Sequence, residues 1–330
     1  MEKQKFLVIQ TAFIGDAILA TALLEKLHFH FPESEIDFMV RKGNEGLFQS
    51  HPFINLLIVW DKKQVKLKNL LTILSSVRKR KYDYIVNLQR FASTGIFTIL
   101  SNAKQKIGFS KNPFSFFFDR KVKHHIDEDS HEIERNQLLI RHITDEDYFR
   151  PRLYPTFQDY ETVKQYKTGS YICISPASVW FTKQLPKEKW IEFLDRIDKE
   201  ISVYLLGGPS DNELCEEIKT ETLHVQIKNL AGKLSLIESA ALMKDALMNY
   251  SNDSAPLHLA SAMNAPITAI FCSTTPSFGF GPLSNKSRIV QSSENLKCRP
   301  CGLHGKSECP EKHFKCGHSI EINDLISVIK

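Results

Sequence analysis

Short apolar runs alternate along the chain with longer stretches in which apolar residues recur at helical spacing. Short apolar runs bounded by turn residues are typical of strands that are buried on both faces of a parallel sheet. In the first half, this pattern predicts strands over 5–10, 35–40, 56–60 and 84–88. In the second half, it predicts strands over 171–175, 203–206, 247–250 and 267–272.

Amphipathic stretches over 16–31 and 69–81 separate strands of the first half and predict helices there. Four further helices are expected to begin near Pro186, Asp211, Ser235 and Pro256. Regular alternation of strands and helices predicts an α/β fold built on doubly wound, Rossmann-like parallel sheets.

A polar, proline-containing stretch over 150–169 interrupts the alternation. Because 330 residues exceed what one core usually holds, we expect two domains, over 1–155 and 156–318. The segment 319–330 is expected to form a closing helix that crosses back to the first domain. Ligands of such sheets bind beyond the carboxyl ends of the strands, which directs attention to the loops after Gln10, Ser175, Leu206 and Tyr250.

Composition is that of an ordinary globular protein, with 42% hydrophobic and 25% charged residues. No stretch approaches the roughly 20 apolar residues of a membrane-spanning helix. The first five residues run directly into a predicted strand and lack the features of a secretion signal. The sequence therefore predicts a cytoplasmic protein whose seven cysteines are reduced or metal-bound.

Positive charge is concentrated in the first half of the chain. Residues 1–155 carry 24 Lys and Arg against 18 Asp and Glu, whereas residues 156–330 carry 19 against 20. The excess lies in the basic runs from Lys62 to Lys68 and from Arg78 to Lys81. Each run is what a solvated helix face presents, but a basic half also suits a membrane surface, an anionic glycolipid or a nucleic acid.

Asp16 opens the first predicted helix, directly after the first strand and Gly15. The segment lacks the spaced glycines of a dinucleotide site and the Gly-Lys-Ser/Thr of a phosphate-binding loop. Asp16 is compatible with two roles: a carboxylate that caps the helix and interacts with its dipole, or a general base that takes a proton from an acceptor hydroxyl.

Two loops of the second half carry residues that suit a nucleotide. Ser178 and Lys183 follow a strand and are able to hold a diphosphate, although an exposed loop lysine is the plainer interpretation. After the next strand, Gly207 and Gly208 permit close backbone approach, and Ser210 or Asp211 is placed to bind ribose hydroxyls or to cap a turn.

The strongest local pattern is the segment from Asn252 to His258. A strand ends in polar residues, and Pro256 lies where a first helical turn tolerates it. The amides of Ser254 and Ala255 would then form an anion site at the helix start. Asp253 is suited to sugar hydroxyls and His258 to a diphosphate; a capping carboxylate and a core histidine explain the same residues.

Together these segments resemble glycosyltransferase family 9, the ADP-heptose:lipopolysaccharide heptosyltransferases, over nearly the whole chain. The resemblance is carried by the Gly15-Asp16 segment, the region from Ser175 to Trp190 with Lys183, the loop from Leu206 to Asp211, and the stretch from Asn229 to Phe271. Each motif is weak alone, and their order and spacing make the pattern specific.

The resemblance implies a two-domain GT-B fold and an inverting, metal-independent transfer of heptose from ADP-heptose to a lipid-linked core of lipopolysaccharide. Asp16 would be the base, and Lys183 would neutralise the leaving diphosphate. Donor-binding residues would be Ser178, Asp211, Asp253, Ser254, Ala255 and His258, and acceptor-binding residues would be Gly15 and Gln89. The partners implied are ADP-heptose, an anionic lipid-linked oligosaccharide and the inner membrane surface, with no nucleic acid and no catalytic cofactor.

Three positions depart from the family pattern: Ala255 replaces a common glycine, Val179 replaces a hydroxyl residue, and Asn87 replaces an acidic residue. These changes bear on donor or acceptor identity more than on the reaction type.

Four cysteines, Cys298, Cys301, Cys309 and Cys316, lie close together near the end of the sequence. In a reducing compartment such a set fits a structural zinc site, with His304, His313 and His318 as alternative ligands. Free thiols or disulfides are the other interpretations. Two other functions fit parts of the sequence: a sugar-nucleotide epimerase of the same fold, and a zinc-bearing nucleic-acid-binding protein.

Overall fold

The computed structural model describes residues 3–61, 66–126 and 130–329. The side chains of the basic run from Lys62 to Lys68 lie outside the described residues. The chain divides into two compact units, Met1–Tyr154 and Pro155–Lys330, next to the boundary predicted at 155.

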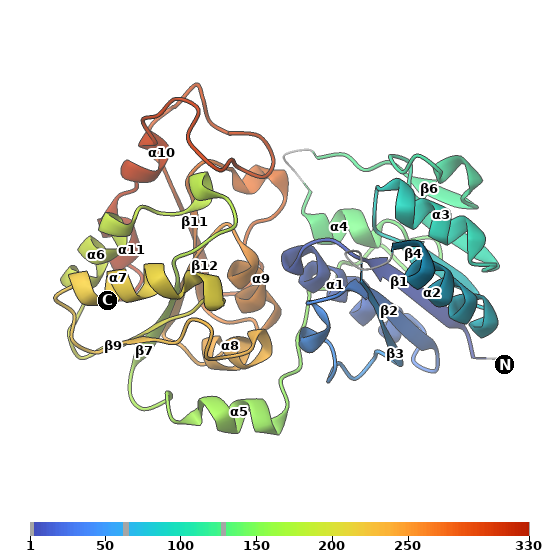
Figure 1. Ribbon diagram of the computed structural model, residues 1–330, viewed down its shortest axis with the longest axis horizontal. Helices are drawn as coiled ribbons and strands as arrows, with labels where there is room; N and C mark the ends of the chain where they lie inside the picture. Colours follow the sequence, from blue (N-terminus) through green and yellow to red (C-terminus); the bar gives the residue numbers. More distant parts are fainter. Residues whose placement is uncertain (1–2, 62–65, 127–129, 330) are drawn as a thin grey trace. The chain divides into compact units, whose positions relative to one another are not determined.

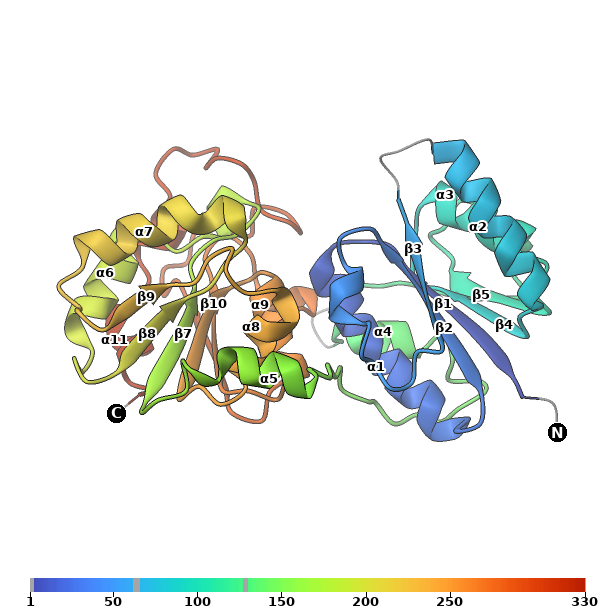
Figure 2. The same cartoon turned by 60° about the horizontal axis from the view of Figure 1, so that its bottom comes forward.

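The first unit contains a six-stranded sheet in the order β3-β2-β1-β4-β5-β6, in which every neighbouring pair is parallel. The strands are β1 (Lys5–Gln10), β2 (Glu35–Arg41), β3 (Leu56–Trp60), β4 (Tyr84–Asn87), β5 (Gln105–Phe109) and β6 (Arg120–Val122). On one face of the sheet α1 (Ile14–His30) packs with α4 (Glu132–Gln137), and α2 (Lys66–Arg80) and α3 (Ala92–Leu100) cover the other (Figures 1 and 2).

The second unit contains another six-stranded parallel sheet, in the order β12-β11-β10-β7-β8-β9. Its strands are β7 (Tyr171–Ser175), β8 (Ser202–Leu205), β9 (Ile227–Asn229), β10 (Met248–Asn252), β11 (Ile267–Phe271) and β12 (Ser287–Gln291).

Helices also cover both faces of this second sheet (Figure 2). One set comprises α5 (Phe157–Lys164), α8 (Leu236–Met243) and α9 (Ala255–Ala262); the other comprises α6 (Lys187–Arg196), α7 (Asn212–Glu221) and α11 (Ile322–Ile326). A short helix, α10 (Lys315–His318), precedes α11.

Both sheets follow the same strand order, 3-2-1-4-5-6 when each unit is numbered from its own first strand. In this order the chain direction across the sheet reverses between the first and fourth strands, and ligands of doubly wound sheets bind at that point. The switch point lies between β1 and β4 in the first unit and between β7 and β10 in the second.

The structure confirms the predicted pair of doubly wound parallel sheets, and each of the eight predicted strands has a counterpart displaced by at most two residues at either end. The pattern did not reveal β5, β6, β9 and β12. These strands are short or carry charged residues, as in Arg120–Val122, so they lack a continuous apolar run. The polar stretch between the halves is also more structured than predicted, because it contains α5.

The core of the second unit includes residues from near the end of the chain. Trp190 and Phe193 of α6 lie in one buried cluster with Tyr250 of β10 and Leu325 of α11. The Tyr250 hydroxyl donates a hydrogen bond of 3.0 Å to the carbonyl of Leu325. The helix expected over 319–330 is therefore shorter than predicted, and its apolar side chains pack in the second core. Within the described residues, no helix is both long enough and apolar enough to cross a membrane.

Candidate functional site

The switch point of the second sheet is spanned by the side chain of Asn252, the last residue of β10. Its Nδ2 donates to the carbonyl of Pro176 at 2.8 Å, and its Oδ1 accepts from the amide of Leu185 at 2.9 Å. Both partners belong to the chain that follows β7. Asn252 is fully buried, so these bonds are shielded from water and fix the loop after β7 against the end of β10.

An ion pair lies immediately beside this connection. Lys183 ends the short 3-10 helix Phe181–Lys183, and its Nζ lies 2.6 Å from Oδ2 of Asp253. The hydroxyl of Thr274 donates to the same carboxylate oxygen at 2.7 Å. The side chain of Lys183 is 13% exposed and that of Asp253 is 8% exposed. The ammonium has three donors, so the bond to Asp253 leaves it able to contact a further anion.

Helix α9 begins two residues after Asp253. Its N-cap residue, Ser254, has an extended backbone, and the Ser254 side chain does not cap the helix. The Ser254 hydroxyl instead lies 3.4 Å from the carbonyl of Asn252. Pro256 occupies the first turn, as the sequence predicted, and lacks an amide hydrogen. The start of α9, with the amide of Ala255, therefore presents positive partial charge next to the ion pair.

The remaining predicted donor residues have different environments. Ser178 is half-buried in the loop after β7, and its carbonyl accepts a bond of 2.6 Å from Nε2 of Gln184. Asp211 accepts a bond of 2.7 Å from the amide of Gly208, so its carboxylate stabilises the turn as the capping interpretation predicts. His258 of α9 is 5% exposed and packs edge-on against Phe280, an environment typical of a core histidine.

The switch point of the first sheet gathers the predicted acceptor residues. Nε2 of buried Gln89, beyond β4, donates to Oε1 of Gln10 at the end of β1. Gly15 and Asp16 lie in the first turn of α1, which leaves the same end of β1. The N-cap of α1 is Phe13, whose side chain makes no capping hydrogen bond. Asp16 is half-buried in the first turn of the helix and is not the N-cap residue.

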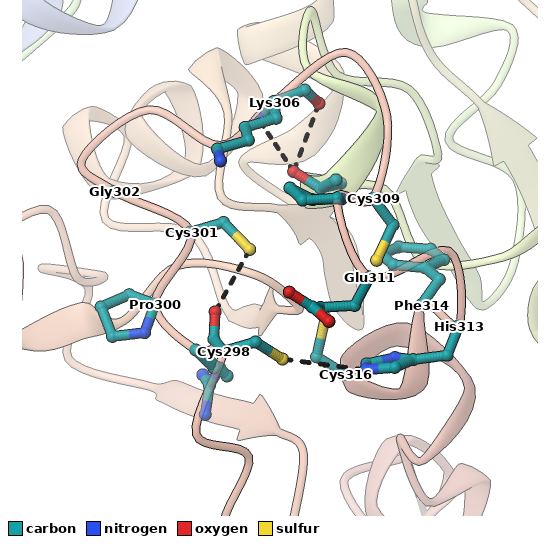
Figure 3. Close-up of a pocket in the computed structure, with 13 residues that line it drawn as sticks. Cys298, Pro300, Cys301, Gly302, Lys306, Cys309, Glu311, His313, Phe314 and Cys316 are labelled. Carbon is teal, nitrogen blue, oxygen red and sulfur yellow. Dashed lines mark hydrogen bonds between the residues drawn. The ribbon is translucent and has the colours of Figure 1, made fainter.

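The four C-terminal cysteines line one cavity of about 350 Å³ together with Lys306, Glu311 and His313 (Figure 3). Nε2 of His313 lies 3.9 Å from Sγ of Cys298, and Sγ of Cys301 lies 3.5 Å from the carbonyl of Cys298. All seven cysteines are free thiols. Burial raises the pKa of Cys316 to about 11 and also raises the pKa of Cys301, with the neighbouring thiols adding to both shifts.

Zinc would require deprotonated thiols in a tetrahedral arrangement. The donor set suits this metal in its chemistry, since four soft ligands line one cavity. Among the described residues, however, no three His, Cys, Asp or Glu side chains are placed to hold a metal ion. The structural zinc site stays a prediction.

The sequence analysis did not single out two threonines that lie at the ion pair. Thr274 binds Asp253, and buried Thr182 precedes Lys183. A polar run, Ser273-Thr274-Thr275, does follow the buried strand β11. This polar run belongs to the site because β11 lies beside β10 in the sheet, and the strand order decides which loops meet at the switch point.

A comparison with family sequence models matches glycosyltransferase family 9 (heptosyltransferase) over residues 70–313. Lipopolysaccharide heptosyltransferase 1 of Campylobacter coli is 27% identical over 99% of this chain and 98% of its own length. These matches span most or all of both units, so they concern the whole architecture and not one motif.

Two solved structures share the fold. The glycosyltransferase family 9 protein of Veillonella parvula DSM 2008 superposes with a TM-score of 0.78 at 22% identity, covering 88% of this chain and 86% of its own. The ADP-heptose lipopolysaccharide heptosyltransferase II of E. coli superposes with a TM-score of 0.78 at 20% identity, covering 99% and 98%. The fold is therefore of the GT-B type. This chain belongs to glycosyltransferase family 9, the heptosyltransferase family, and is a glycosyltransferase.

Proposed function

We propose that this enzyme transfers heptose from ADP-heptose to the inner core of lipopolysaccharide, with inversion at the anomeric carbon and without a catalytic metal ion. The observation that carries the proposal is the ion pair of Lys183 and Asp253 at the switch point of the second sheet, beside the start of α9. Together these groups offer positive charge for a diphosphate and a carboxylate for sugar hydroxyls.

Lys183 would neutralise the charge that develops on the diphosphate as the bond to the anomeric carbon breaks. The helix start at Ser254 and Ala255 would add oriented backbone dipoles, which cost no reorganisation during the reaction. In this proposal, these groups take the place of the divalent cation that many nucleotide-sugar enzymes use. Asp253, held by Thr274, would accept hydrogen bonds from heptose hydroxyls.

Asp16 would act on the acceptor. Its carboxylate would take the proton of the attacking hydroxyl while the acceptor oxygen forms a bond to the anomeric carbon and ADP departs from the opposite face. One displacement of this kind inverts the configuration. Gly15 and Gln89 would contribute to the acceptor site at the end of the first sheet.

The acceptor would be an anionic, lipid-linked oligosaccharide, which suits the positive charge of the first 155 residues. A protein that meets this acceptor and a nucleotide sugar would work in the cytoplasm, peripherally on the inner face of the membrane. The similar proteins from Campylobacter coli and E. coli are named for heptose transfer to lipopolysaccharide, which supports the same acceptor class.

The proposal is tested by incubating the purified enzyme with ADP-heptose, with and without a heptose-free lipopolysaccharide acceptor, in the presence of EDTA. We expect ADP release and glycosylated acceptor only when both substrates are present. Consumption of ADP-heptose to an isomer without acceptor would indicate an epimerase. Loss of transfer in EDTA, restored by a divalent cation, would contradict the metal-independent mechanism.

Two lysine variants test whether Lys183 takes part in the reaction. Lys183→Met should lower kcat strongly, because removing one preorganised charge from a leaving group costs about 10²- to 10³-fold. Lys187→Met is the matched control: Lys187 lies four residues on, paired with Glu217 and Glu221 at the surface. Equal activity of the two variants would remove Lys183 from the mechanism.

A further inference from the structure

The loop that carries the first two cysteines also contacts both members of the Lys183–Asp253 pair through their neighbours. We call residues 298–306 the tail loop. It follows β12 in the sequence but lies against the 3-10 helix that ends in Lys183 and against the residues that follow β11. These contacts are backbone hydrogen bonds and buried or part-buried side-chain hydrogen bonds, so they define a fixed position.

Thr182 links the tail loop to Lys183. Its hydroxyl accepts bonds from the amide of Lys306 at 2.8 Å and from the hydroxyl of Ser273 at 2.9 Å, and it donates to the carbonyl of Lys306 at 3.3 Å. A threonine hydroxyl has one donor and two acceptor positions, so all are used. The Thr182 amide adds a fourth bond, of 3.1 Å, to the Lys306 carbonyl. At 1% exposure, this residue has no access to water as an alternative partner.

The other end of the tail loop holds the segment that follows β11, which includes Thr274, the residue whose hydroxyl binds Asp253. Nη2 of Arg299 donates to the carbonyls of Phe271 at 3.2 Å and of Thr274 at 2.8 Å. The amide of Cys301 donates to the carbonyl of Ser273 at 2.8 Å. Thr274 is the residue whose hydroxyl binds Asp253, so the backbone behind that contact is fixed from the tail loop.

Gly305 brings the tail loop into direct contact with the lysine. Its φ is +75°, a conformation that side-chain-bearing residues rarely adopt. A Cβ at this position would lie 3.1 Å from Cγ of Lys183 and 3.1 Å from the Thr182 hydroxyl. The backbone of the tail loop therefore forms part of the wall along which the Lys183 side chain runs.

We propose that the tail loop positions the Lys183–Asp253 pair for the donor diphosphate, and that Thr182 is the positioning residue through which it acts on Lys183. The inference rests on the proposed function in assigning the donor site to this pair. It adds that a loop remote in sequence sets the geometry of that site. Small displacements of a charged group from its productive position cost up to about 10²-fold in rate.

The test uses the full-length enzyme and compares Thr182→Val with Thr182→Ser. Valine keeps the shape but removes the hydroxyl, whereas serine keeps the three hydrogen bonds. We expect Thr182→Val to lower kcat with ADP-heptose by roughly 10- to 100-fold and to raise KM much less, and Thr182→Ser to restore most of the activity. Thr268→Val is the matched control, because Thr268 is a buried threonine of β11 whose hydroxyl has no hydrogen-bond partner among the described residues.

A double variant separates positioning from a general structural role. If Thr182 acts through Lys183, Thr182→Val in a Lys183→Met background should lower kcat by less than about twofold further, since the group it positions is already absent. A role in folding alone would lower the activity of both backgrounds by the same factor. Equal factors, or full activity of Thr182→Val, would overturn the proposal.

Two further measurements keep the test decisive. If Thr182→Val does not fold, Gly305→Ala is judged by the same criteria, because its Cβ would press on Lys183 and on the Thr182 hydroxyl while every hydrogen-bonding group stays in the chain. Calorimetric titration with ADP provides a readout that does not depend on the sugar. Failure of the wild-type enzyme to use ADP-heptose would refute the proposed donor, whereas unchanged ADP affinity and unchanged turnover in the variants would refute the role of the tail loop.

Discussion

Removing Lys183 alone should destabilise the second unit more than removing both members of the Lys183–Asp253 pair. Asp253 is a buried residue, and in Lys183→Met its carboxylate keeps the hydroxyl of Thr274 as its remaining described partner. Leaving a charge buried and unpaired costs about 3–5 kcal/mol. In Asp253→Asn, the amide oxygen still accepts from Thr274, and the flexible lysine is able to turn toward water, so the expected cost is only about 1–2 kcal/mol.

The double variant Lys183→Met/Asp253→Asn contains neither charge. Its expected cost is about 1–2 kcal/mol, which is below the sum of the single costs by about 3–5 kcal/mol. This coupling is large because both side chains are withdrawn from water; a pair of the same length at the surface would give about 0–1 kcal/mol.

Urea unfolding followed by tryptophan emission measures these differences. Trp180 and Trp190 report on the second unit, and a Trp60→Phe background removes the signal of the first. The separation matters because a chain of two units does not unfold in one two-state transition. If the double variant costs as much as the two single variants together, the pair is not coupled and the reasoning about the donor site is wrong. Lys187→Met, at the surface, should leave the midpoint nearly unchanged.

Three other predictions concern the first unit and the cysteines. Asp16→Asn should abolish transfer while ADP-heptose still raises the melting temperature, because the carboxylate is proposed to act on the acceptor; loss of both effects would make Asp16 a structural residue. The zinc prediction expects about one zinc per chain by elemental analysis and none in Cys298→Ser/Cys301→Ser, and a metal-free wild-type protein would refute it. Burial lowers the pKa of His51 from 6.5 to about 4, so below pH 6.5 the unfolded chain takes up a proton that the folded unit does not. Between pH 7 and pH 5, this group should therefore lower the free energy of unfolding of the first unit by about 2 kcal/mol. His51→Gln should weaken this pH dependence, which is measured from urea midpoints. Burial also raises the pKa of Glu25, whose carboxylate lies 3.6 Å from His51, and this shift stabilises the folded unit as the pH falls further. A pH dependence of stability that is the same in His51→Gln as in the wild type would contradict the assignment to His51.

The sequence predicted those elements whose buried residues form a recognisable pattern of apolar positions. β1, β3 and β7 each contain an apolar run of four or five residues, and their bounds agree with the prediction. Edge strands such as β6 and β12 are more exposed to solvent than central strands. They therefore contain polar residues, and the apolar pattern that would predict a strand is missing. Helix starts were found where a chemical signal marks them, as Pro186 and Ser235 do.

Prediction of the site was limited by the need to know which loops meet. Lys183 and Asp253 were each recognised, but their direct contact depends on β7 and β10 being neighbours, which no local pattern states. Thr182 and Arg299 were not recognised for the same reason: their partners lie 124 and 25 to 28 positions away. Arg299 also lies between Cys298 and Cys301, and this pair of cysteines was interpreted as part of a metal site.

The packing of Leu325 against Tyr250 has a consequence for how this protein is made on the ribosome. All six strands of the first sheet lie before residue 123, so that unit is able to fold while the rest is being synthesised. The second unit has no such freedom, since Ile320, Ile322 and Leu325 belong to its core and emerge only after all six of its strands. A nascent chain that stalls in this interval lacks the α11 side chains that pack in one cluster with Trp190 and Phe193, so we expect chaperones to bind it until α11 has emerged.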